Sequence, residues 1–234
     1  MKNQLNLAAS VWLATALAAP AQSLLTAEHV DVGIGYDGGL WDLHVHDETN
    51  DQEYEPGDAI LFVGMTASNG VPANPLFNFL GNPDDPVWIL PQNQNPSLLY
   101  LGIGSEELRA GVFVGDLVTL TLSGVSGPGH FALYQTDTFG SPTVFMNSRD
   151  GITAGDSYTM GAGNHAHFNW AFSGMGTYTL SFEASGTLVA GNQFTSSGPV
   201  DYTFQVVPEP GSVVLFILGG LGLLILVRQR LTPG

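Results

Sequence analysis

Hydrophobic and polar residues alternate along several short stretches of the chain. Val200 to Val206 places large apolar side chains at every second position, with Asp, Thr and Gln between them. The stretches from Tyr178 to Glu183 and from Val118 to Leu122 repeat the same period of two. Residues two apart on a strand point to the same face, so this pattern predicts strands with one buried face.

Two shorter runs, at 59–63 and 87–90, are apolar without alternation and predict strands buried on both faces. Turn sequences rich in Gly, Pro and Asp separate the strands, and no long amphipathic helical pattern competes with them. We therefore predict an all-β fold, an antiparallel immunoglobulin-like or jelly-roll β-sandwich, with Tyr178 after a tight turn as in a tyrosine corner. The Asn-, Pro- and Gly-rich segment 66–96 is expected to be a long surface excursion, interrupted by the strand at Val87, that covers one end of the sandwich.

Both ends of the chain have the pattern of targeting segments. Residues 1–21 begin with Lys2, continue with a mainly apolar stretch and end in Ala-Pro-Ala, which is the layout of a secretory signal peptide. Near the other end, the fifteen residues 213–227 lack a polar side chain and are followed by Arg228 and Arg230. Their number is at the lower edge of the ~20 needed to span a bilayer, and we predict one transmembrane helix there. Basic residues stay cytoplasmic, so the bulk of the protein is expected outside.

The tail resembles the PEP-CTERM sorting signal of Gram-negative bacteria that produce exopolysaccharide. Pro208, Glu209 and Pro210 match its motif, and the apolar stretch and the two arginines match its helix and basic end. The resemblance implies that an exosortase removes the helix, so the protein is held in the inner membrane only transiently before it reaches the cell surface or extracellular matrix. A permanent single-pass anchor is the alternative. The predicted organisation is a signal peptide at 1–21, an extracytoplasmic β-sandwich at 22–207 and the sorting signal at 208–234.

Composition narrows the classes of function. The chain of 234 residues has 21 acids against 5 bases, a formal net charge of −16 and no cysteine. Between the two predicted targeting segments there are 20 acidic residues, and the only basic residues are Arg109 and Arg149. So acidic a protein repels phosphate backbones, which argues against nucleic acid as a partner. Without cysteine, any metal site must use histidine, carboxylate or carbonyl ligands.

Five of the six histidines fall in three short pairs of residues two apart, namely His29 with Asp31, His44 with His46, and His165 with His167. Alternation with apolar neighbours such as Val30, Leu43 and Phe168 predicts that each pair lies on the polar face of a strand, side by side. Imidazole with carboxylate suits Zn²⁺, and also Cu²⁺, Ni²⁺, Mn²⁺ or Fe²⁺, and two pairs supply enough ligands for one site. The alternative is that these histidines are exposed or hydrogen-bonded without a metal. The candidate ligands are His29, Asp31, His44, His46, His165 and His167.

Other candidate sites have weaker support. His130 stands alone beside a turn and is expected to be structural. The segment 47–58 is rich in acids, but Gln52 occupies the position at which an EF-hand loop requires Gly, so calcium is a less favoured ligand than solvent. Asp47 is a further candidate that could join His46 at a metal. No motif of a hydrolase nucleophile, a zinc protease or a phosphate-binding loop occurs, the glycines are interpreted as turn formers, and we expect no enzyme.

The stretch from about Glu28 to Val206 resembles the choice-of-anchor M domain of bacterial surface proteins. The segments that carry the resemblance are HVDVGIGYDGGLWDLHVHDE, VWILPQ, LGIGSEEL, HAHFNWAFSGMGTYTLSFEASGTL and YTFQV. Actinobacterial relatives are associated with metal-type ABC transport systems, which implies that the domain captures or presents a metal. The family pattern touches His29, Asp31, His165 and His167 most clearly.

Two functions are therefore in competition. The first is a secreted, surface-retained protein that binds a divalent transition metal through the paired histidines and has a metal-transport system as a partner. The second is a structural or adhesive protein of the exopolysaccharide matrix, whose exposed aromatic and acidic side chains contact polysaccharide or other proteins and whose histidines bind no metal.

Overall fold

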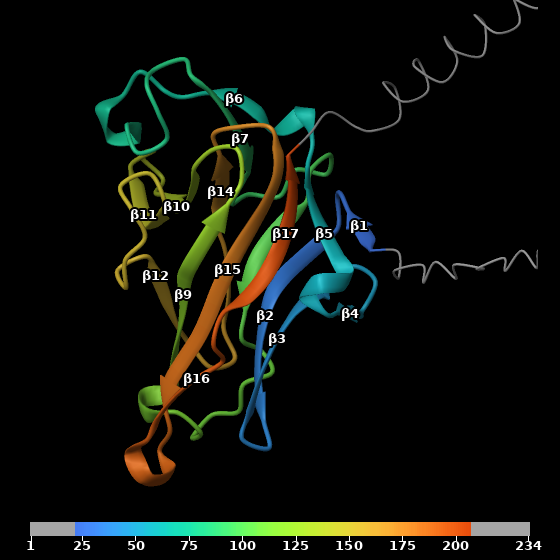
Figure 1. The fold of residues 1–234 in the computed structure, drawn as a ribbon, viewed down its shortest axis with the longest axis vertical. Helices are drawn as coiled ribbons and strands as arrows, with labels where there is room; N and C mark the ends of the chain where they lie inside the picture. Colours follow the sequence, from blue (N-terminus) through green and yellow to red (C-terminus); the bar gives the residue numbers. More distant parts are fainter. Residues whose placement is uncertain (1–21, 207–234) are drawn as a thin grey trace, which may run out of the picture.

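The computed structural model describes residues 22–206, and these residues form strands joined by turns, with no α-helix among them. Figure 1 shows long strands stacked in layers. An all-β, sandwich-like fold is thus confirmed. The signal peptide, the sorting signal and the helix expected at 213–227 lie outside the described residues.

Sheet A forms one layer of the fold and contains the longest strand. Short 3₁₀ turns interrupt the loops: η1 (Pro56–Asp58), η2 (Met65–Ala67), η3 (Pro75–Phe77), η4 (Val114–Asp116) and η5 (Ala190–Asn192). The strand order in sheet A is β1 (Ser23–Leu25), β5 (Ala59–Val63), β17 (Val200–Val206), β15 (Gly176–Thr187), β9 (Leu117–Ser126) and β12 (Ser157–Gly161), with β16 (Phe194–Ser196) paired to β15.

Sheets B and C each have five strands. Sheet B has the order β13 (His165–His167), β8 (Tyr100–Gly104), β2 (His29–Asp37), β3 (Leu40–Asp47) and β4 (Gln52–Tyr54). Sheet C has the order β11 (Pro142–Asn147), β10 (Phe131–Thr136), β14 (Asn169–Phe172), β7 (Pro86–Leu90) and β6 (Ser68–Gly70).

The pairing is mostly antiparallel, but three pairs of strands are parallel. They are β1 with β5, β5 with β17, and β2 with β8. The expectation of an antiparallel sandwich is therefore corrected at these pairs. Parallel neighbours need long connections, and β2 reaches β8 only after the chain has passed through sheets A and C. Local alternation carries no signal for such a connection.

The main core fills the space between sheet A and the other two sheets. Trp170 of β14 stacks on Phe204 of β17, with 5.7 Å between ring centroids, and Phe172 lies 5.2 Å from the same ring. The alternating residues of β15 and β17 point inward as predicted, because Leu180, Phe182, Phe204 and their same-face neighbours are fully buried. Aromatic packing thus holds sheet C against sheet A.

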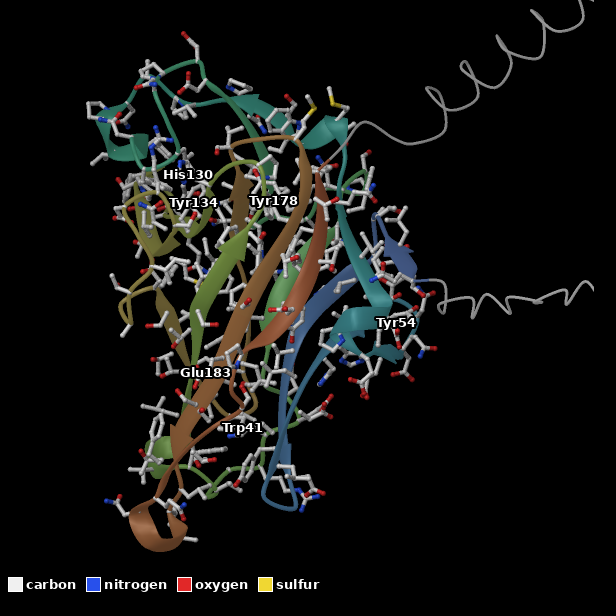
Figure 2. All side chains as sticks on the ribbon, in the orientation of Figure 1. Trp41, Tyr54, His130, Tyr134, Tyr178 and Glu183 are labelled. Carbon is white, nitrogen blue, oxygen red and sulfur yellow. The ribbon has the colours of Figure 1, made fainter. Side chains whose placement is uncertain are left out.

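A smaller apolar cluster covers the outer face of sheet C. Phe77 and Phe79 from the segment between β5 and β7 pack there against Tyr134, which Figure 2 labels beside His130. Val87 points into this cluster, whereas Trp88 of the same strand points into the main core. The run 87–90 is therefore buried on both faces, as predicted. The excursion at 66–96 thus covers the outer face of sheet C. We had expected it to cover one end of the sandwich.

Two local features lie in the part of the chain that follows the last histidine pair. Tyr178 is fully buried and donates its hydroxyl to the carbonyl of Gly174 at 3.0 Å, which confirms the tyrosine corner at the start of β15. Between β13 and β14 only Phe168 intervenes, and there the chain passes from sheet B to sheet C. Its buried ring lies 4.8 Å from that of Tyr158. This anchor sets the position of β13 at the edge of sheet B.

Candidate metal centre

The outer face of sheet B gathers five of the six histidines. The apolar residues that alternate with them, such as Val30 and Val32, are fully buried in the core, so the predicted polar face is correct. This face is nevertheless partly covered, because Asp31 is only 1% exposed and His44 only 5%. Burial of a carboxyl and an imidazole on the outer side of a sheet is unusual without a partner.

Register across sheet B explains how distant residues meet. Asp31 of β2 pairs with Gly102 of β8, and Gly102 pairs in turn with His167 of β13. Two residues further along β8, Gly104 pairs with His165 of β13. Outer strands of such a triplet are about 9.5 Å apart, since neighbouring strands are separated by about 4.8 Å. Glycine on the middle strand lets side chains from β2 and β13 meet above β8.

Steric contacts show that these glycines are required for space. A Cβ atom on Gly102 would overlap the Oδ1 atom of Asp31, and one on Gly33 would overlap the Nε2 atom of His44. A Cβ on Gly104 would lie 2.6 Å from Oε2 of Glu106. The interpretation of the glycines as turn formers is thus wrong at these three positions, which lie inside strands.

The three-histidine group comprises His29, Asp31, His165 and His167. One ligand atom from each residue lies within 4.8 Å of all the others. The Nε2 atom of His167 is 3.1 Å from that of His29 and 2.8 Å from that of His165. Asp31 Oδ1 is 3.5 Å from His165 Nε2. The structure therefore brings together four of the six candidate ligands, from two strands far apart in sequence.

Hydrogen bonding alone does not account for these contacts. A ring nitrogen carries in its plane either one hydrogen or one lone pair, so His167 Nε2 forms at most one regular hydrogen bond with its two neighbours. Neither oxygen of Asp31 has a hydrogen-bond partner within residues 22–206. Ligand nitrogens around a tetrahedral zinc ion are about 3.3 Å apart, close to the spacing found here. The donor set and its convergence fit a divalent cation.

Burial sets the protonation states of the group. Desolvation, with the nearby Glu106 and Glu48, raises the pKa of Asp31 to about 8. Desolvation lowers the pKa of His167 to about 4 and also lowers the pKa of His29. His167 stacks on Tyr100, with ring centroids 3.6 Å apart. His29 and His167 are therefore neutral near pH 7, which is the form that binds a metal.

A second group of ligand atoms consists of His44, His46 and Glu107. One atom from each lies within 4.8 Å of the others, and His44 Nε2 is 3.2 Å from Glu107 Oε1. The structure thus separates the middle histidine pair from the three-histidine group, although both groups lie on the same face. Sequence reasoning missed Glu107 and its neighbour Glu106, which follow β8 after Ser105.

Carboxylates hold one histidine of each group at its Nδ1 atom. Glu106 Oε1 is 3.1 Å from His165 Nδ1, and Glu48 Oε1 is 3.2 Å from His46 Nδ1. An imidazole that donates from Nδ1 to a carboxylate presents its Nε2 lone pair outward, which is the usual second-shell arrangement at protein metal sites. One carboxylate oxygen from each of Asp31, Glu48 and Glu106 also lies within 4.8 Å of the other two. The repeated spacing of Gly33 and Gly35 with Gly102 and Gly104 is a signal that could have revealed this face.

The remaining candidates lie apart from both groups. Asp47 accepts hydrogen bonds from the backbone of Thr49 and Asn50 and fixes the turn after β3, so the structure does not join it to His46 at a site. Within residues 22–206, Glu48 is the only acid of the segment 47–58 that belongs to a group of three ligand atoms. His130 belongs to none, and Figure 2 labels it beside Tyr134 in the upper part of the view.

Comparisons with known protein families, curated proteins and solved structures each gave no match. The resemblances to the choice-of-anchor M domain and to PEP-CTERM proteins thus stay predictions. Among the residues that the structure describes, none belongs to a helix with the length and apolar character needed to cross a membrane.

Proposed function

We propose that the three-histidine group binds one divalent transition-metal ion, with Zn²⁺ as the first candidate. The observation that carries the proposal is the convergence of three Nε2 atoms, 2.8 Å and 3.1 Å apart, beside the buried and unpartnered carboxylate of Asp31. A cation at this point would occupy all three lone pairs and compensate the carboxylate. His165, already held through Nδ1 by Glu106, needs no rearrangement to serve as a ligand.

The proposal includes the cellular setting inferred from the sequence. We place the domain, an immunoglobulin-like or jelly-roll sandwich, outside the inner membrane of a Gram-negative bacterium, after a signal peptide at 1–21 and before an exosortase-processed tail. There the protein would capture a metal or present it to a metal-transport system. Support for this setting comes from the order of the motif at Pro208–Pro210, the apolar stretch and the two arginines.

A structural or adhesive role in the exopolysaccharide matrix is the second candidate. Phe139 is 92% exposed and Phe194 is 66% exposed, and aromatic rings on a surface are suited to contact a sugar face or another protein. This role requires no tightly bound metal. Metal content therefore separates the two functions, whereas export does not.

Elemental analysis tests metal binding by the three-histidine group. The full chain, produced without a histidine tag, is expected to retain zinc after gel filtration, and the His165→Ala/His167→Ala variant is expected to lose the ion of this group. His130→Ala is the matched control, because it removes a histidine that belongs to neither group. Equal zinc content in all three proteins would contradict the proposal, as would its absence from the wild type.

The sorting signal is tested by changing Pro208, Glu209 and Pro210 to Ala. If an exosortase removes the tail, the variant is expected to stay in the inner-membrane fraction at the size of the uncleaved form, while the wild type appears at the surface or in the medium at a smaller size. The same size and location for both proteins would contradict exosortase sorting and favour a permanent anchor.

A further inference from the structure

We propose that the second group, His44, His46 and Glu107, is a separate binding site for a divalent transition-metal ion. It shares no ligand with the three-histidine group and lies next to it on sheet B. The domain would then hold two ions on one face. The second site does not depend on the first, because its ligands come from β3 and from the loop after β8.

The contacts of His44 point to a missing partner. The side chain of this residue is only 6% exposed, and its Nδ1 atom has no hydrogen-bond partner within residues 22–206, the nearest carboxylate being Asp42 at 3.9 Å. Its Nε2 atom is directed over Gly33 toward Glu107. Burial of an imidazole with so few hydrogen-bond partners is costly, and an ion bound at Nε2 would offset part of this cost.

The second histidine of this site is already held as a metal ligand would be. His46 Nδ1 lies 3.2 Å from Glu48 Oε1, as His165 Nδ1 lies 3.1 Å from Glu106 Oε1 in the first group. In both cases a carboxylate fixes the ring at Nδ1 and leaves Nε2 free to bind. The same arrangement therefore occurs twice on this face.

Room for an ion exists beside His44. A small cavity of about 40 Å³ is lined by Asp31, Gly33, His44, Gly104, Glu106 and Glu107, among other residues. Gly33 and Gly104 create this space, since any side chain there would fill it. The volume suffices for an ion with a water molecule, given that about one probe sphere of 10–15 Å³ holds a water.

An acidic cavity lies on the other side of His44. Its volume is about 330 Å³, and it is lined by Asp42, His44, Glu53, Tyr54, Glu55 and Asp58. Figure 2 labels Tyr54 on this flank of the molecule. Four carboxylates raise the local concentration of cations, so this cavity gives an approach to His44 from solvent. The acids around this cavity would thus attract cations toward His44, in addition to interacting with solvent.

The two sites are expected to differ in strength. The second has two imidazoles where the first has three, and Glu107 is 40% exposed. Fewer protein ligands and more solvent leave coordination positions for water or a small anion. Titration with Zn²⁺ is therefore expected to fill the three-histidine group first and the second site afterwards.

Stoichiometry at saturating Zn²⁺, measured by equilibrium dialysis with elemental analysis, tests the proposal. We expect two ions for the full-length wild type and for His130→Ala, and one ion for His44→Ala/His46→Ala. The His165→Ala/His167→Ala variant is expected to bind one ion, at the second site. One ion in both the wild type and His44→Ala/His46→Ala would overturn the second site and leave the first intact. If His165→Ala/His167→Ala bound as many ions as the wild type while His44→Ala/His46→Ala bound one fewer, only the three-histidine site would fail.

A milder change keeps the test valid if the double variant unfolds. Glu107→Gln removes a partly exposed charge, and we expect it to lower the number of bound ions from two to one at Zn²⁺ concentrations that saturate the wild type. Glu183→Gln on β15 of sheet A is its matched control and is expected to bind two ions. Two ions bound with equal affinity by both variants would contradict the role of Glu107.

Discussion

Asp31 illustrates how one residue links stability to binding. Its carboxyl is buried among three imidazoles and has no hydrogen-bond partner in the described part of the chain, so the metal-free protein favours the protonated form. Folding thus preserves a buried acid whose ionised form a bound cation would stabilise. Such perturbed carboxyls are typical of functional sites.

The metal-free protein is expected to lose stability between about pH 6.5 and 8. The pKa of Asp31 rises on folding from near 3.8 to about 8, so the folded state holds the extra proton and stability falls as pH rises through this window. Below pH 6.5, the lowered pKa of His167 has the opposite effect and offsets the loss down to about pH 4. The slope from Asp31 is at most about 1.4 kcal/mol per pH unit.

Urea unfolding in the presence of a chelator, at pH 6.5 and 8, measures this loss. Asp31→Asn is expected to abolish the difference between the two pH values and also to weaken zinc binding. Asp150→Asn, which changes an exposed carboxylate, is the control and should behave as wild type. An unchanged pH dependence in Asp31→Asn would show that the burial of Asp31 has no energetic effect.

At the scale of the element, the glycines of β2 and β8 determine whether the histidines can meet. The alternation that predicts strands also predicts the polar face of His29, Asp31 and the two later pairs, and this part of the site was accessible from sequence. The convergence of these residues on one point could not be predicted from the sequence. It depends on the parallel pairing of β2 with β8 and on the position of β13 at the sheet edge. Glu106 and Glu107 were missed because their role appears only when the loop after β8 is placed.

Gly102→Ala is expected to lower zinc affinity at the three-histidine group by tenfold or more, about 1.4 kcal/mol. Its Cβ would overlap Asp31 Oδ1 and approach the carbonyl of Ala166 at 3.0 Å, which is backbone and cannot move aside. Gly104→Ala should cost less, because the contact there is with the flexible end of Glu106. Isothermal titration with Zn²⁺ measures both.

Gly57→Ala is the matched control for these substitutions, since a Cβ at that position meets nothing within 4 Å. Equal zinc affinity for Gly102→Ala and Gly57→Ala would contradict the steric role assigned to β8. A larger loss of zinc affinity for Gly104→Ala than for Gly102→Ala would contradict the prediction that Gly102 is the more sensitive position.

At the scale of the whole molecule, the acidic charge has few cationic partners. The formal net charge is −16, and within residues 22–206 the one ion pair of an arginine joins Arg109 to Asp37 at 3.8 Å on the surface. The all-β architecture followed from local alternation and turn residues. The division into three sheets and the three parallel pairs did not, because long connections set them.

Added salt is expected to stabilise the metal-free protein. Repulsion between acids destabilises a compact chain, and raising NaCl from 10 to 150 mM shortens the screening length from about 30 to about 8 Å. The melting temperature should therefore rise in a chelator-treated sample, and rise less when Zn²⁺ is present. A melting temperature that falls with salt in the metal-free sample would mean that attractive ion pairs dominate.

X-ray absorption at the zinc edge tests metal binding by the three-histidine group most directly. Wild-type protein that has received less than one equivalent of Zn²⁺ is expected to show three nitrogen ligands and one oxygen ligand at about 2.0–2.2 Å, with the outer-shell scattering of imidazole rings. The imidazole signal should fall in His165→Ala/His167→Ala and persist in His130→Ala. A first shell of oxygen atoms alone, without imidazole scattering, in the wild type would contradict the proposed site.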